Sequence, residues 1–100
     1  MERRNDIPNL LAMYIRNTRE IYNITTRLQN CLIKKINNGV QPQMEYFANC
    51  STMKTIIREA SKLLYKYDGI TPTKQEKQEA VREHAKYILD SVQYSIQKHQ

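Results

Sequence analysis

The chain has 100 residues, the size of one domain, and its 40% hydrophobic and 26% charged residues separate it from disordered chains. Two glycines and three prolines provide too few turns for a β-sandwich or a β-barrel. The sequence has neither the apolar core of a signal peptide nor an apolar run long enough for a membrane-spanning helix. We therefore expect residues 1–100 to form a single helical domain in the cytoplasm, or in a host cell's cytoplasm if the protein is viral.

The first predicted helix covers residues 8–38. Pro8 suits a first helical turn, and no glycine or proline follows it until Gly39, which suits the position just after a helix. Apolar residues recur at steps of three and four along this segment. Further apolar residues widen the stripe on one side: Ile15, Tyr22, Ile33 and Ile36. So wide a stripe indicates contact with more than one neighbouring helix, or with a second copy of the chain.

The second and third predicted helices cover residues 43–67 and 74–97. Gly69 follows the second helix, although the weak helix formers at residues 49–52 leave a kink or a break there as an alternative. Thr73 and Glu76 have the spacing of a capping box at the start of the third helix. Because short turns join antiparallel neighbours, the pattern predicts an all-α, up-down-up antiparallel three-helix bundle.

Folding the chain back at Gly39 pairs residues whose numbers sum to about 81. Tyr14 then lies beside Tyr67, and Cys31 lies level with Cys50. A disulfide requires Cα atoms within about 7 Å, whereas packed helices lie about 8–10 Å apart. We therefore favour two buried free thiols over a disulfide between these cysteines.

Catalytic and metal-binding patterns are absent from the sequence. His84 lies near the apolar row of the third helix, where a lone histidine is usually a boundary residue. No pair of histidines has the spacing of a zinc-binding helix, and no glycine-rich loop suits a phosphate group. We expect no enzymatic activity, no metal, no cofactor and no small-molecule substrate.

Basic residues form two helical stripes in a chain whose net charge is +6. The first helix carries Arg16, Arg27 and Lys34 on one polar stripe. The second helix carries four basic residues at strict i, i+4 spacing: Lys54, Arg58, Lys62 and Lys66. Like charges at this spacing destabilise a helix by about 0.2–0.5 kcal/mol per pair, so the second stripe requires compensation.

Two sources of negative charge would offset the repulsion along the second stripe. The favoured one is pairing with carboxylates of the third helix, from Glu76, Glu79, Glu83 and Asp90. The other is an anionic partner such as nucleic acid, whose phosphates attract lysine and arginine. Such binding would be mostly to the backbone, because the long antiparallel helices do not suit a helix-turn-helix motif.

Tyrosine is the dominant aromatic residue, with seven copies against one phenylalanine and no tryptophan. Tyr46, Tyr65 and Tyr87 fall off the apolar rows, and exposed tyrosines are frequent in protein interfaces. Together with Ile15, Tyr22, Ile33 and Ile36 they are the candidate interface residues. We favour a non-catalytic protein–protein interaction or assembly module, a homodimer or a subunit of a complex. The alternative is a nucleic-acid-binding accessory protein of the kind that viruses or mobile elements encode.

Overall fold

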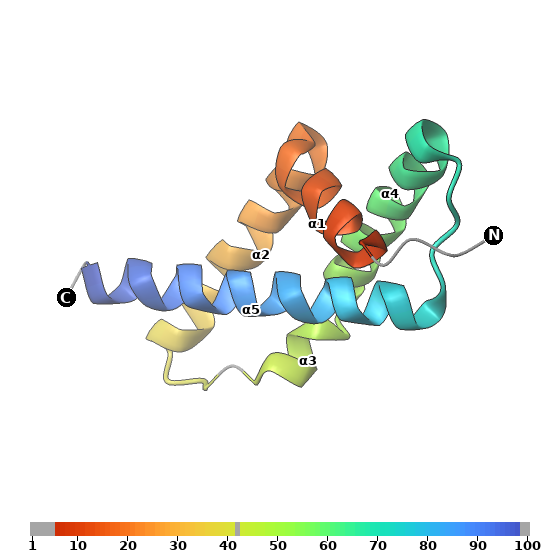
Figure 1. Cartoon of the computed structure of the whole chain (residues 1–100). Coiled ribbons are helices and arrows are strands. Elements are labelled where there is room, and N and C mark those ends of the chain that lie inside the picture. Colours follow the sequence, from red (N-terminus) through yellow and green to blue (C-terminus); the bar gives the residue numbers. More distant parts are fainter. Residues whose placement is uncertain (1–5, 42, 99–100) are drawn as a thin grey trace.

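The computed structural model describes residues 6–41 and 43–98, with the backbone alone for residues 45, 46 and 98. Within these residues every regular element is a helix (Figure 1): α1 (Ile7–Asn17), α2 (Arg19–Asn37), the short α3 (Met44–Ala48), α4 (Ser51–Asp68) and α5 (Lys74–Lys98). The predicted all-α bundle is confirmed. The predicted number of helices is wrong, because this part of the chain forms four long helices instead of three.

The first predicted helix is broken at Thr18, which has an extended backbone with φ −99° and ψ 118°. Its amide still donates to Tyr14 O, and its carbonyl still accepts from Tyr22 N, so the break costs few backbone hydrogen bonds. The buried residues explain the break. Those of α1 (Ile7, Leu11, Ile15) and those of α2 (Ile21, Thr25, Leu28, Leu32) lie on faces that differ by roughly 70° at 3.6 residues per turn. One straight helix would not bury both faces equally well.

The second predicted helix is divided at Asn49 and Cys50, as the weak helix formers of this segment allow. Cys50 is the N-cap of α4, and its Sγ accepts a hydrogen bond from the Met53 amide at 3.4 Å. The alternative of a break in residues 49–52 is thereby confirmed. The short α3 on the other side of the break packs against α5.

The remaining helix ends agree with the turn residues of the sequence. Gly39 and Gly69 both have positive φ, and Gly69 is the left-handed C-cap of α4. The Thr73 amide donates to Glu76 Oε1 at 2.7 Å, and the Glu76 amide donates to Thr73 Oγ1 at 3.1 Å. The predicted capping box at the start of α5 is therefore confirmed.

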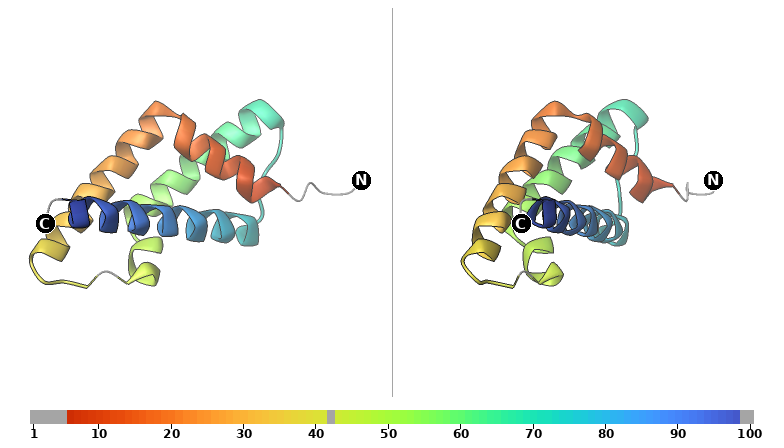
Figure 2. Two further views of the ribbon diagram at one scale, coloured as in Figure 1. Left: turned by 60° about the vertical axis from the view of Figure 1, so that its left-hand side comes forward. Right: turned by 90° about the vertical axis from the view of Figure 1, so that its left-hand side faces the viewer.

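The helices pack in an arrangement other than the predicted up-down-up bundle. Figure 2 shows α1 and α2 as the two arms of a V, with α5 running across their open side. Both arms pack against α4 and α5. The molecule is elongated, 51 × 24 × 22 Å, with α5 along its length (Figure 1).

Among the described residues the hydrophobic core is aliphatic apart from the buried ring of Phe47. The buried hydrophobic residues are Ile7, Leu11, Ile15, Ile21, Leu28, Leu32, Phe47, Met53, Ile56, Ala60, Leu64, Ala80, Ala85, Ile88 and Val92. Thr25 and His84 are the buried polar residues of the described chain. The helices of this part are each too short or too polar to cross a lipid bilayer.

Candidate basic surface

The basic row of α4 consists of Lys54, Arg58, Lys62 and Lys66, and all four side chains are exposed. The opposite face of α4 is buried through Met53, Ile56, Ala60 and Leu64. The amphipathic pattern therefore fixes the row on the solvent side. Twelve residues separate its ends, which corresponds to about 18 Å of helix.

The carboxylates of α5 do not neutralise this row in the described structure. The ion pairs of the row go to Glu59 of the same helix, which lies 3.8 Å from Arg58 Nε and 3.3 Å from Lys62 Nζ. Glu76 belongs to the capping box, while Glu79 and Glu83 line a hollow beside Pro8 and Asn9. The favoured compensation by α5 is therefore wrong for this part of the chain, and the row keeps a net positive charge.

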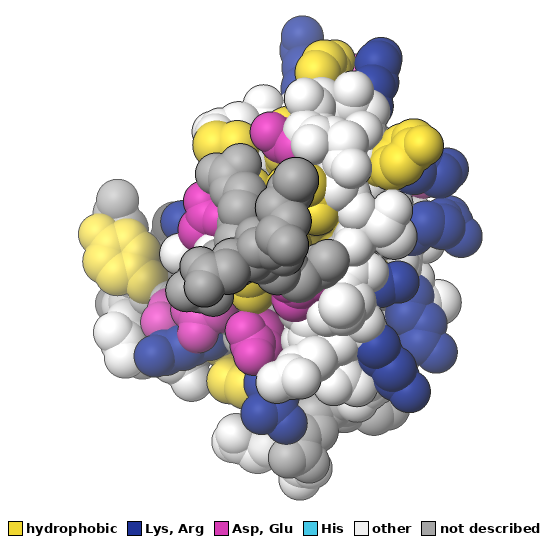
Figure 3. Space-filling view, turned by 45° about the vertical axis from the view of Figure 1, so that its right-hand side comes forward, with side chains coloured by type: hydrophobic (Ala, Val, Ile, Leu, Met, Phe, Trp, Pro, Cys, Tyr) yellow, Lys and Arg dark blue, Asp and Glu magenta, His cyan; other side chains and the backbone are white. Residues whose placement is uncertain are grey.

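A groove of about 730 Å³ continues the basic row at its Lys54 end. It lies between α3, the first half of α4 and the first half of α5. Its lining comprises the basic residues Lys54, Lys74, Lys77 and Arg82 with Met44, Ala48, Asn49, Ile57, Gln78 and Val81. We refer to this site as the amphipathic groove. Figure 3 shows basic side chains along one edge of the molecule and acidic side chains nearer the middle of that view.

The stripe predicted on the first helix is also exposed. Arg27 and Lys34 lie in α2 on the side away from its buried residues. Arg16 lies in α1, where its guanidinium carbon is 5.2 Å from the centre of the Tyr87 ring. The break at Thr18 thus separates Arg16 from the other two residues and engages it in a cation–π contact within the molecule.

The candidate interface residues fall into different environments. Ile15 is buried in the core, so it is wrong as a surface contact, and its burial follows from the rotation of the apolar face at Thr18. Ile33 and Ile36 are half-buried against the core. Tyr22, Tyr65 and Tyr87 are exposed, and the side chain of Tyr46 lies outside the described residues.

The two cysteines do not form a disulfide in the structure, and both are free. Cys50 is half-buried as the N-cap of α4, but Cys31 is exposed. The prediction of two buried thiols is therefore wrong for Cys31. By contrast, the predicted neighbours Tyr14 and Tyr67 do stack, with ring centres 6.2 Å apart.

His84 is buried instead of lying at the boundary of the core, which corrects the sequence-based prediction. Its Nε2 lies 3.1 Å from Oγ1 of Thr25, and its ring stacks on Tyr87 at 5.9 Å. Burial, and then the positive charge of Arg16, lower the pKa of His84 to about 4. The histidine is neutral at pH 7, and its role is to pack in the core and to form a hydrogen bond with Thr25. The one sequence signal for this pair is the position of Thr25 in the apolar row of α2.

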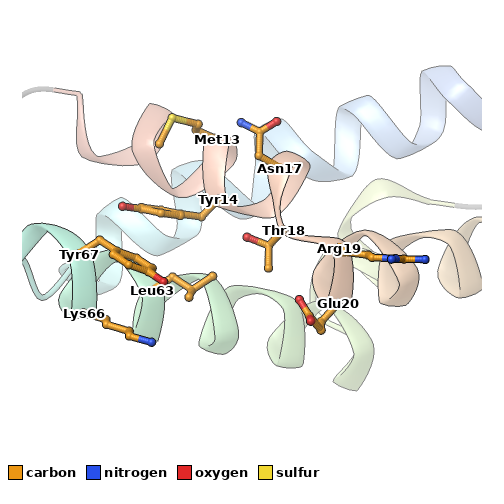
Figure 4. Close-up of a pocket in the computed structure, with 9 residues that line it drawn as sticks. All are labelled: Met13, Tyr14, Asn17, Thr18, Arg19, Glu20, Leu63, Lys66 and Tyr67. Carbon is orange, nitrogen blue, oxygen red and sulfur yellow. The ribbon is translucent and has the colours of Figure 1, made fainter.

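A second hollow, of about 630 Å³, lies where α1 meets α2, against the end of α4 (Figure 4). The Tyr14–Tyr67 stack forms part of its wall, and the Tyr14 hydroxyl donates to Asp68. Its charged residues have mixed signs, since Arg19 and Lys66 are basic and Glu20 is acidic. Figure 4 shows Arg19 directed away from the tyrosine pair. This hollow therefore has no convergent set of charges.

The described residues contain no group of three or more metal-binding side chains. Comparison of the chain with protein-family models, curated proteins and solved structures gives no match. The most distinctive feature of the chain is the basic row of α4 together with the amphipathic groove. Sequence reasoning identified the row but missed Lys74, Lys77 and Arg82, because their relation to α4 depends on the crossing of α5.

Proposed function

We propose that the chain is a non-catalytic module that binds nucleic acid, mostly through the phosphate backbone, on the basic row of α4. The observation that carries this proposal is the exposure of four cations at i, i+4 spacing without a carboxylate partner from α5 among the described residues. An anionic ligand would remove the repulsion between them that the fold leaves in place.

The side chains around the row suit backbone contacts. Lysine and arginine neutralise phosphates regardless of base sequence. Tyr65 lies one helical turn from Lys62 and is 65% exposed, so its ring is available to stack on an unpaired base. Arg27 and Lys34 on α2 offer further exposed cations for a longer strand.

Fluorescence anisotropy tests this proposal with labelled single-stranded and double-stranded DNA of about 20 nucleotides. We expect micromolar binding at about 50 mM salt that weakens roughly 100-fold by about 200 mM, as four duplex phosphate contacts require. Substituting Arg58→Gln and Lys62→Gln together should weaken binding. The matched pair Arg19→Gln and Lys86→Gln removes the same charge elsewhere. Absence of binding at about 50 mM salt and 100 µM protein would refute the proposal.

A protein-binding function is the second candidate, and the exposed tyrosines favour it. Tyr22, Tyr87 and Tyr94 are 56%, 42% and 66% exposed, although large aromatic side chains usually lie in a core or an interface. Self-association predicts a mass above 12 kDa in light scattering at micromolar concentration. A monomer at every concentration would count against it. The cytoplasmic location also stays a prediction.

A further inference from the structure

The amphipathic groove has a basic rim and an apolar floor, and the apolar floor distinguishes it from the row on α4. Lys54 and Lys74 are exposed at the rim and Lys77 is half-buried there. These three lysines make no ion pair within the described part of the chain. Arg82 also borders the groove but lines the neighbouring hollow with Glu79 and Glu83 as well. The three lysines therefore carry the positive potential of the rim.

The floor of the groove is aliphatic. Ala48, Ile57 and Val81 are half-buried and pack against the core, while Met44 is 36% exposed at the edge. None of the described lining residues is aromatic. A floor of this kind offers no platform for base stacking, which is the usual way in which apolar surface contributes to nucleic-acid binding. It suits leucine and isoleucine side chains, and methionine adapts well to different partners.

We propose that the amphipathic groove binds an acidic amphipathic helix of a partner protein. Leucine or isoleucine side chains at i, i+3, i+4 and i+7 would pack on the floor, as in other helix-in-groove complexes. Carboxylates on the two flanks of that helix would face Lys54, Lys74 and Lys77. The described residues contain no strand, so no sheet edge is available there for an extended peptide. Charge complementarity selects an acidic helix over a neutral or basic one.

The test uses the full chain and a fluorescein-labelled peptide of about 15 residues, roughly four helical turns, built from leucine, alanine and glutamate with leucine at helical spacing. Its control has the same composition in scrambled order. We expect the amphipathic peptide to bind at least about tenfold more tightly than the scrambled one. Met44→Gln should weaken binding by about tenfold, whereas Met44→Leu should retain it. Because Met44 lies at the edge of the groove, neither change threatens the core.

Variants of the rim lysines show whether the groove and the row bind different ligands. Lys74→Gln and Lys77→Gln together should weaken peptide binding about tenfold but change DNA binding less than about threefold, and the pair Arg58→Gln and Lys62→Gln should do the reverse. Equal binding of the two peptides would overturn the proposal. Unchanged binding of the peptide to the Met44→Gln variant would also overturn it. If single-stranded DNA fully displaced the peptide bound to the Arg58→Gln/Lys62→Gln variant, the groove would be assigned to nucleic acid and the proposal would be overturned. Circular dichroism of each variant verifies folding.

Discussion

The polar groups in the interior and those on the outer face of α4 differ in how far other groups of the chain satisfy them. Inside, His84 and Thr25 are paired with each other, and no buried side-chain nitrogen or oxygen in the described chain lacks a hydrogen bond. Outside, Arg58 and Lys62 share the carboxylate of Glu59, and the other two cations of the row have no ion pair in the same part of the chain. The interior is optimised for stability, because an unpaired buried polar group costs about 1–3 kcal/mol. The charges on the outer face contribute no comparable free energy to folding.

This difference indicates which residues fold the protein and which are available for a partner. Removing an interior polar group should cost stability, whereas removing a cation of the row should cost none.

Replacing the buried histidine should have the largest effect. His84→Ala leaves a cavity and an unpaired Thr25 hydroxyl, so we expect a loss of about 3–4 kcal/mol in the free energy of unfolding, measured with urea. Thr25→Val leaves His84 without its partner and should cost about 1–3 kcal/mol. The double variant His84→Leu with Thr25→Val replaces both partners by apolar groups and should be less destabilised than the sum of the single variants His84→Leu and Thr25→Val. An additive double variant would contradict a coupled pair.

Acid should destabilise the protein through the same histidine. The pKa of His84 is lowered from 6.5 to about 4 in the folded chain, so between these values the unfolded state binds the additional proton. The stability of the neutral form is fully present above pH 6.5 and falls as the pH decreases towards 4. At pH 5 we expect a loss of about 2 kcal/mol relative to pH 7.5. The double variant with His84→Leu and Thr25→Val lacks this group, and its stability should be nearly flat over this range. If stability fell equally with decreasing pH in the wild-type chain and in the double variant, burial of His84 would be contradicted.

Removing charge from the row should have the smallest effect, and of opposite sign. Lys54→Gln removes the like-charge pair with Arg58 at i, i+4 and leaves Glu59 its contacts with Arg58 and Lys62. Lys66 does not suit this test, because its ammonium group lies 5.3 Å from the centre of the Tyr67 ring. We expect a gain of about 0.2–0.5 kcal/mol per pair removed, detectable as a higher urea midpoint at low salt that vanishes at high salt. A loss of stability would mean that Lys54 has a structural partner.

Local signals predicted most helix ends. Gly69 and the Thr73–Glu76 capping box stop and start helices through their own backbone chemistry, so the neighbouring sequence was sufficient. The stacking of Tyr14 on Tyr67 followed from the turn at Gly39 and helical periodicity. The break at Thr18 has neither glycine nor proline. It arises because tertiary packing favours two differently rotated apolar faces, which a search for local breakers does not detect.

The candidate sites differ in the same way. The row on α4 follows from periodicity within one helix and was visible in the sequence. The amphipathic groove requires α3, α4 and α5 together, with Lys54 and Lys77 distant in sequence, and so depends on the angle at which α5 crosses the other helices. His84 looked like a boundary residue because its partner Thr25 is 59 positions away. Residues that act within one element were predicted; of the contacts between elements, the stack of Tyr14 on Tyr67 was predicted, but the groove and the pairing of His84 with Thr25 were not.

The salt dependence of DNA binding, compared between two variants of equal charge, shows whether the row of α4 is the surface that contacts phosphates. If the row of α4 contacts phosphates, Arg58→Gln with Lys62→Gln should reduce the slope of log K against log salt by about 1.4 for single-stranded DNA, or about 1.8 for duplex. Arg19→Gln with Lys86→Gln should leave that slope unchanged. Equal slopes in the two variants would contradict the assignment of the row as the binding surface.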